Sequence, residues 1–279
     1  MSSSAEIEPL DASYLTEPNL EDVKRQLGIY EGGRIKLTKD EDSGVAYLCI
    51  DHAEKKNCFS GKMMVDFNDA VAELEKWETG KGLILYSSGD LFCSGSFLNV
   101  VKQLTDDPNH GYRASCLMHD SVQRLRNLPL VSVAIVQGKS IGGGGEIMLS
   151  TDFRLFTQNT LVAYVQAKMG ITTAWGAGMF LKQKVGHSKA LDYILTGRKI
   201  LTEEALAVGL ADGIVNHETR LDDALTWLNA RIQHLPTSLV RAQKRNILAT
   251  SFLEERQVLG SLWGRPSHLN ALNQNYKHY

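Results

Sequence analysis

The segment VSVAIVQGKSIGGGGEIMLST, residues 131–151, decides the fold of this chain. Its apolar run Ser132–Gln137 predicts a buried strand, and Glu146–Thr151 predicts a helix. Gly142–Gly145 lie between them, although each glycine costs about 1 kcal/mol relative to alanine in a helix. Since the first N–H groups of a helix lack intrahelical partners, such glycines allow an oxyanion or a phosphate to approach bare backbone. The alternative is a tight turn with close packing of helix on strand.

A second turn of small residues, Phe92-Cys93-Ser94-Gly95-Ser96, has a similar setting. It follows the predicted strand Leu83–Tyr86 and precedes the helical pattern Leu98–Leu104. Such a turn presents a backbone N–H beyond the end of the strand. Two of these turns together can hold one oxygen between two amides as an oxyanion hole, in which each donor is typically worth about 3 kcal/mol in a transition state. Taken alone, the second turn is a weak signal and is more typical of an ordinary loop.

Composition predicts an ordinary globular protein of the α/β class. The chain has 279 residues, of which 43% are hydrophobic and 22% charged, enough for one large domain or two small ones. The 30 Lys and Arg residues against 32 Asp and Glu give a net charge of −2, and the basic clusters are short, so we expect no nucleic-acid partner.

Cysteine and histidine spacing predicts neither disulfides nor a metal site. The four cysteines contain no C-x-x-C pair, and the histidines contain no H-x-x-x-H or H-E-x-x-H pair. The start of the chain has no pattern of a signal or transit peptide, and no apolar stretch approaches 18 residues, so we expect no membrane association. Free thiols and the absence of a targeting pattern lead us to expect a cytosolic protein.

The rhythm of the chain alternates strands with helices, as in α/β proteins. Predicted strands are Arg34–Leu37, Val45–Ile50, Leu83–Tyr86, Val131–Val136, Phe153–Phe156, Leu161–Val165 and Ile214–Val215, and the clearest helices are Met63–Trp77, Ala114–Leu125 and Leu221–Leu235. We expect a loose tail over residues 1–25, a core over residues 26–200 and a helical region over residues 201–279.

Two side chains of the central segment suggest chemistry. Glu146 is the one acidic residue of an otherwise apolar and glycine-rich stretch, which would raise its pKa and suit it to proton transfer, unless it caps the helix. Ser140 lies in a formal G-x-S-x-G nucleophile elbow, followed by Asp212 and by His217 or His234 in the order of a serine hydrolase. Against the hydrolase, three further glycines separate the elbow from the first helix former.

These residues resemble the enoyl-CoA hydratase/isomerase (crotonase) superfamily from about Gly33 to Trp263. The family resemblance rests on the strand before Gly142–Glu146 and on Asp152-Phe153-Arg154, Phe92–Ser96 and Met169-Gly170-Ile171. A branch of alkylmalonyl-CoA decarboxylases is the most similar, through Asn57–Met64, Gly80–Ile84, Leu98–Lys102, Ala174-Trp175-Gly176 and Leu259–Gly264.

The resemblance implies a spiral of ββα units, a C-terminal helical trimerisation region and a homotrimer or homohexamer. It implies an acyl-CoA substrate, whose thioester oxygen is held by the amides of Ser96 and Gly143, with Glu146 as the catalytic proton donor. No cofactor is implied, because CoA is part of the substrate. The expected substrate-binding residues are Cys58, Ser60, Ser94, Phe97, Gly142, Gln166, Trp175 and Phe180.

Several positions depart from the family pattern around this pocket. Gln166 stands where hydratases have a second glutamate and the decarboxylase branch has histidine, which argues against hydration. Phe97 replaces a common aspartate, Thr173 a common proline, and Gly178-Met179-Phe180 a polar stretch. The sequence therefore predicts decarboxylation of an alkylmalonyl-CoA; the alternatives are another crotonase reaction, such as hydration or isomerisation, a diverged acyl-CoA protein and, more remotely, a serine hydrolase.

Overall fold

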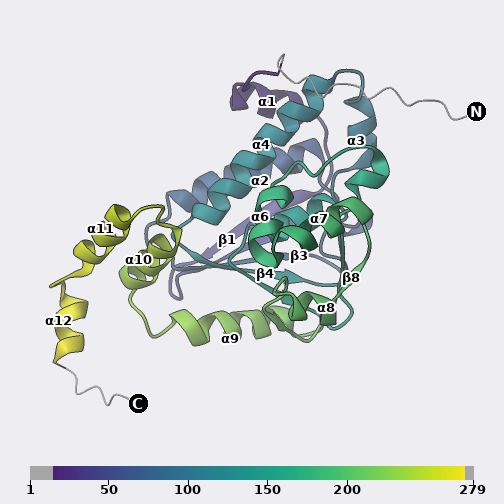
Figure 1. Cartoon of the computed structure of the whole chain (residues 1–279). Coiled ribbons are helices and arrows are strands. Elements are labelled where there is room, and N and C mark those ends of the chain that lie inside the picture. The colour runs from purple at the N-terminus through teal and green to yellow at the C-terminus, as the bar shows by residue number, and fades with distance from the viewer. Residues whose placement is uncertain (1–14, 274–279) are drawn as a thin grey trace, which may run out of the picture.

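A six-stranded sheet in the order β1-β2-β3-β4-β6-β9 forms the centre of the computed structural model, which describes residues 15–273 (Figure 1). Its strands are β1 (Arg34–Asp40), β2 (Val45–Asp51), β3 (Gly82–Ser87), β4 (Val131–Val136), β6 (Phe153–Phe156) and β9 (Gly213–Ile214). β1 and β2 pair antiparallel, and all other neighbours pair in parallel. All of these strands were predicted, with bounds that differ by a few residues.

Helices cover both faces of this sheet, which explains why its central strands are apolar at almost every position. Alternate residues of β2, β3 and β4 pack with α2 (Gly61–Glu75) and α4 (Pro108–Asn127) in the larger core. The residues between them pack with α9 (Arg220–Ile232) in a second core. The three clearest helices predicted from the sequence are therefore confirmed.

A second, smaller sheet has the strand order β5-β7-β8. It consists of β5 (Lys139–Ile141), β7 (Leu161–Ala163) and β8 (Ile200–Leu201). Strand β5 was not predicted, and it separates β4 from the glycines. The chain thus repeats a strand of the large sheet, a strand of the small sheet and a helix, in β4-β5-α5 (Gly143–Met148) and β6-β7-α6 (Ala177–Val185). This repetition is the predicted ββα pattern.

The expected loose N-terminal tail is wrong for residues 20–25, which belong to α1 (Leu20–Leu27). The Asn19 side chain caps this helix by accepting hydrogen bonds from the amides of Glu21 and Asp22. Val23 and Leu27 are buried, and α1 packs on α2 and α4. Residues 1–14 of the expected tail lie outside the described residues.

The C-terminal region is mainly helical, as predicted. It contains α8 (Thr202–Ala207), α9, α10 (Thr237–Leu248), α11 (Phe252–Leu262) and α12 (Pro266–Leu272), together with β9. Two further helices of the chain, α3 (Leu98–Gln103) and α7 (His187–Thr196), precede this region. Figure 1 shows α11 and α12 extending away from the body of the molecule. Residues 274–279 lie outside the described part.

An ion pair between a buried arginine and a partly exposed aspartate joins the C-terminal region to the core. Arg154 on β6 is fully buried, and its guanidinium donates to the Asp212 carboxylate at 2.5 Å and to the Leu210 carbonyl at 2.7 Å. The Arg154 amide also donates to Asp212. Strand β9 follows Asp212 directly and pairs with β6.

Candidate active site

Two backbone amides with no hydrogen-bond acceptor within residues 15–273 lie beside each other, those of Ser96 and Gly143. The amide and carbonyl of Phe59 pair with Gly95 and Phe97 at 2.8 Å each, so the Ser96 amide between them faces away from Phe59. Gly143 is the first residue of α5. A Cβ built on Gly95 would lie 3.2 Å from the Gly143 nitrogen, which shows how closely the two predicted turns meet.

Close packing explains much of the glycine run, as the alternative interpretation proposed. A Cβ on Gly144 would lie 2.2 Å from the Cys93 carbonyl oxygen, and one on Gly143 would lie 2.4 Å from Cζ3 of Trp175. Gly142 has a φ of +55°, which L side chains rarely adopt. Ligand access is therefore not needed to account for Gly144, whereas the free amide of Gly143 still has no structural use.

Glu146 is 2% exposed and its carboxylate accepts four hydrogen bonds. Its Oε1 accepts from Nε2 of Gln166 at 2.7 Å and from the Ala174 amide at 3.4 Å. Its Oε2 accepts from the amides of Trp175 at 2.7 Å and Ala177 at 3.1 Å. Burial raises the pKa of the carboxyl, as predicted, and these donors oppose the rise. The carboxylate caps the start of α6 and not its own helix.

Gln166 has one satisfied and one unsatisfied end. It is 7% exposed, and its Nε2 faces Glu146, because a carboxylate oxygen requires a donor. Its Oε1 has no hydrogen-bond partner within the described residues. A Cβ on Gly142 would lie 3.8 Å from Nε2 of Gln166. The structure therefore places Gln166 beside Gly142 and leaves a buried acceptor there, while contact of either residue with substrate stays a prediction.

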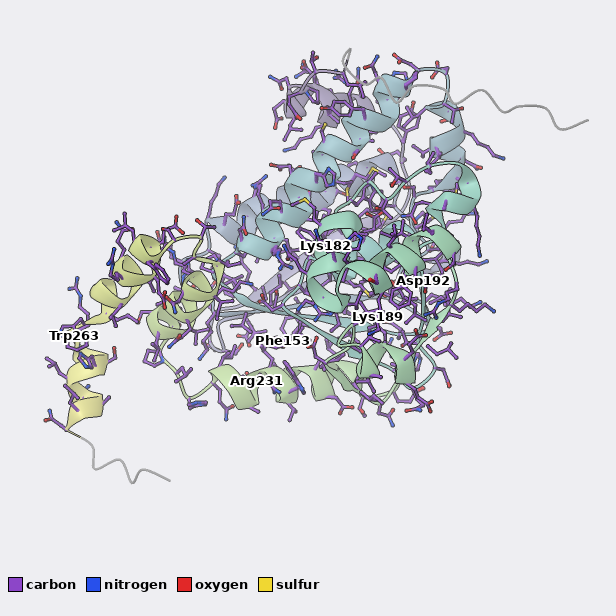
Figure 2. The ribbon with its side chains drawn as sticks, viewed as in Figure 1. Phe153, Lys182, Lys189, Asp192, Arg231 and Trp263 are labelled. Carbon is purple, nitrogen blue, oxygen red and sulfur yellow. The ribbon has the colours of Figure 1, made fainter. Side chains whose placement is uncertain are left out.

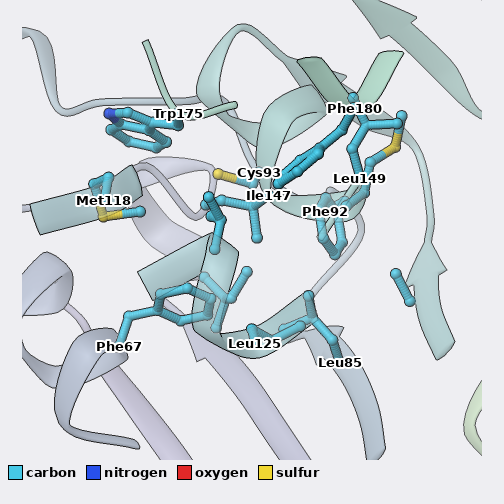
Figure 3. Close-up of a cluster of buried hydrophobic side chains, with 14 of the residues drawn as sticks. Phe67, Leu85, Phe92, Cys93, Met118, Leu125, Ile147, Leu149, Trp175 and Phe180 are labelled. Atoms are coloured by element: carbon cyan, nitrogen blue, oxygen red, sulfur yellow. The ribbon is translucent and has the colours of Figure 1, made fainter. Parts of the chain in front are cut away.

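Two of the expected substrate-binding residues, Trp175 and Phe180, are buried aromatic side chains. The Trp175 ring packs on Gly143 and lies 5.9 Å from the ring of Phe59, centroid to centroid. Phe180 is 4% exposed, and the Arg126 guanidinium covers its ring at 4.7 Å. Figure 3 shows Phe180 and Trp175 as members of the same hydrophobic cluster. Phe180 is thus packed in the core, and its contact with substrate stays a prediction.

Ser60 is a structural residue in this fold. Its hydroxyl accepts the Met63 amide at 3.1 Å as the N-cap of α2 and donates to the Gly32 carbonyl at 2.6 Å. The side chain is fully buried. Ser60 therefore uses its hydrogen-bonding capacity within the protein, and the predicted contact with substrate does not fit its surroundings.

The remaining predicted binding residues lie along the two turns. Phe97 is partly buried and meets the His52 ring edge-on at 6.1 Å. Ser94 is partly buried, and its amide donates to the Lys56 carbonyl at 3.1 Å. Cys58 is buried, which raises the pKa of its thiol. A contact of these side chains with substrate stays a prediction.

The serine hydrolase alternative is wrong. Ser140 is fully buried in β5, and its hydroxyl contacts the sulfur of Met148 at 3.8 Å. Asp212, its expected acid, accepts hydrogen bonds from Arg154. The elbow motif is a strand, and so Ser140 is not presented on the sharp turn that a nucleophile elbow requires.

The amides of Ala174 and Ala177 were missed by the sequence analysis. They act through backbone atoms, and their side chains carry no chemical signal. Only the Trp175-Gly176 turn before a helix marks this segment, because the first N–H groups of any helix favour a carboxylate.

Residues 15–273 also bear on membrane association and on metal binding. No helix in this range is both long and apolar enough to cross a bilayer. In the same range, no three His, Cys, Asp or Glu side chains gather in a way that would hold a metal ion. All four cysteines are free thiols.

The repeated ββα units, together with the adjacent amides of Ser96 and Gly143, define a class of proteins. The family model described as enoyl-CoA hydratase/isomerase matches residues 40–260, and the chain belongs to this family. Among solved structures it is similar to an enoyl-CoA hydratase from Bacillus anthracis, with a TM-score of 0.78 and 21% identity, covering 85% of this chain and 94% of that one. An enoyl-CoA hydratase from Thermoplasma volcanium has a TM-score of 0.75 and 24% identity, covering 87% and 97%.

Curated relatives narrow the similarity further. The chain is 36% identical over 265 residues to ethylmalonyl-CoA decarboxylase of Xenopus laevis, covering 92% of this chain and 88% of that protein. It is 38% identical over 267 residues to ethylmalonyl-CoA decarboxylase of Bos taurus, covering 92% and 86%. The human protein of that name is 36% identical over 267 residues, which cover 92% of this chain and 86% of the human protein.

Proposed function

We propose that this protein removes CO2 from an alkylmalonyl-CoA of the ethylmalonyl or methylmalonyl type. The observation that carries the proposal is the pair of adjacent free amides of Ser96 and Gly143. The chain is similar over most of its length to proteins named ethylmalonyl-CoA decarboxylase, and this similarity supports the same reaction.

The amide pair fits the electronic demand of this reaction. When the bond between Cα and the carboxylate breaks, CO2 leaves and the electron pair forms an enolate whose charge lies on the thioester oxygen. The Ser96 and Gly143 amides would hold that oxygen more tightly as an enolate than as a carbonyl, which lowers the barrier. A proton added to Cα then gives the shorter acyl-CoA.

The side chains favour decarboxylation over hydration. Adding water to an enoyl thioester requires one group to activate water and one to protonate carbon. Glu146 and Gln166 are hydrogen-bonded neighbours here, and a carboxamide does not exchange protons as a carboxyl does. One carboxyl is thus present where hydration needs two acid–base groups.

The test is a panel of malonyl-, methylmalonyl-, ethylmalonyl- and crotonyl-CoA, with products followed by mass. We expect loss of CO2 from a branched malonyl thioester and little water addition to crotonyl-CoA. Efficient hydration of crotonyl-CoA, with no CO2 from any malonyl thioester, would give the alternative crotonase reaction precedence. Thermal shifts with butyryl-CoA supply an independent check of thioester binding, because a bound ligand raises the melting temperature.

We further propose a homotrimer or a dimer of trimers in the cytosol. Support for assembly comes from α11 and α12, on which Phe252, Leu259, Trp263 and Leu272 are more than half exposed. Figure 2 shows Trp263 at this outlying end of the molecule. The free thiols support a reducing compartment.

A further inference from the structure

The hydrogen bonds around Glu146 bear on which group protonates the substrate. The family resemblance implies that Glu146 does so, and an acid must carry its proton on an oxygen that faces the substrate. A carboxylate has about four lone-pair positions. In this protein all of them are taken, two on Oε1 and two on Oε2, by neighbours within the fold.

These neighbours are all donors. Three are backbone amides, of Ala174, Trp175 and Ala177, and the fourth is Nε2 of Gln166. A protonated Glu146 would direct its O–H at one of these N–H groups and break that hydrogen bond. Backbone amides cannot rotate away unless the start of α6 moves. Donors of this number and kind favour the ionised carboxyl.

The segment that Glu146 holds also shapes the amide pair. The Trp175 amide bonds to Glu146, and the Trp175 ring packs against the Cα of Gly143, where a Cβ would come within 2.4 Å of it. We propose, on the basis of the proposed function, that Glu146 is a positioning residue and not the acid that protonates the substrate. As a carboxylate it holds segment 174–177 in place, and it thereby positions the Trp175 ring that packs against Gly143.

The groups around Glu146 do not change their own charge in the pH range of the test, so the pH dependence of kcat would report the ionisation of Glu146. Gln166 and the backbone of segment 174–177 do not titrate. Tyr164 on the β7 side faces Glu146, and burial holds its pKa far above the usual range, so it stays protonated. The fully buried Arg154, which acts on Tyr164, pairs with Asp212.

The first test uses the opposite pH dependences of the two roles in the unmodified protein. An acid works when protonated, so kcat would fall as pH rises through the pKa of Glu146. A positioning carboxylate works when ionised, so we expect kcat to fall as pH is lowered through that pKa. Over the same pH range, a peptide that covers residues 174–177 should lose protection from amide exchange, measured relative to the intrinsic exchange rate at each pH. A kcat limb that falls with rising pH and vanishes in Glu146→Gln would overturn the proposal.

The second test does not require turnover. In Glu146→Gln, the new amide group would face backbone donors, so we expect exchange of the 174–177 peptide to accelerate by about 10- to 100-fold, in line with losing hydrogen bonds to a charged group. Glu204→Gln is the matched control, because Glu204 pairs with Arg198 and Tyr193 elsewhere. Unchanged exchange in Glu146→Gln would contradict the positioning role.

The two tests separate this inference from the proposed function. If no malonyl thioester loses CO2 but exchange accelerates in Glu146→Gln, the proposed function fails and the positioning role stands. If CO2 is released but exchange is unchanged, the positioning role fails alone. Should Glu146→Gln not fold, the pH dependence of exchange in the unmodified protein gives the same decision.

Discussion

At the scale of single residues, Gly143 satisfies two requirements that no other amino acid meets. It has no Cβ, so the Trp175 ring can lie against it, and its amide stays free beside that of Ser96. The first requirement is packing and the second is chemical. A substitution that keeps the amide but adds a methyl group therefore tests how strictly the ring and the amide pair must be placed.

We predict that Gly143→Ala lowers decarboxylation turnover by about 100-fold, because displacing the amide has an effect similar to losing one oxyanion donor. Its methyl group would meet Trp175 at 2.4 Å, so ring and backbone must shift. Steady-state kinetics measure the effect, and urea unfolding checks the fold. Gly111→Ala on α4 is the control, because nothing lies within 4 Å of its added Cβ. Full turnover in a folded Gly143→Ala would place the oxyanion hole elsewhere.

Gln166→Glu probes the choice between decarboxylation and hydration. It replaces the donor 2.7 Å from Glu146 by a second carboxyl, and two carboxyls so close raise the pKa of one of them. We expect CO2 release to fall, because the added charge repels a malonyl carboxylate, and trace hydration of crotonyl-CoA to appear. Both products are measured by mass in one assay. Undiminished decarboxylation would show that Gln166 lies away from the substrate carboxylate.

The sequence was sufficient to predict the paired turns, because glycine runs restrict where backbone can approach. It also pointed to Glu146 as a buried carboxyl. The partners of Glu146 could not be predicted, since three of the four are backbone amides of a segment 28 to 31 residues away. The burial of Phe180 could not be predicted, because an aromatic residue next to a turn gives the same sequence pattern on a pocket wall and in the core.

At the scale of elements, the strands and long helices followed from hydrophobic periodicity. Strand β5 was missed because three residues between two glycines, Gly138 and Gly142, are too short for a periodic pattern. Helix α1 was missed because its sequence LEDVKRQL is mostly polar, and Val23 and Leu27 alone mark its buried side. Capping was also underrated, as Ser60 shows.

We predict that Ser60→Ala lowers the free energy of unfolding by about 1–3 kcal/mol, since it removes the N-cap of α2 and leaves the Gly32 carbonyl without its donor. Urea denaturation measures this change. The KM for the thioester substrate should stay close to that of the unmodified protein. A large rise in KM with unchanged stability would return Ser60 to the substrate-binding residues.

At the scale of the whole molecule, α11 and α12 leave apolar side chains in water that a second copy of the chain would cover. We predict that Trp263→Asp, at a side chain 68% exposed, lowers the molecular mass in light scattering after gel filtration. Asn270→Asp adds the same acid to a polar, exposed position of α12 and should leave the mass unchanged. An unaltered assembly in Trp263→Asp would move the interface away from this surface.

The Arg154–Asp212 pair has a consequence for truncation. A chain that ends at residue 200 would keep Arg154 but lose both the Asp212 carboxylate and the Leu210 carbonyl. Because Arg154 is fully buried, losing these partners would leave its charge uncompensated inside the protein, which is strongly destabilising. Such a fragment would also expose the sheet face that α9 covers. We therefore expect a chain without residues 201–232 to be much less stable than the whole protein, although it would keep most of the spiral core.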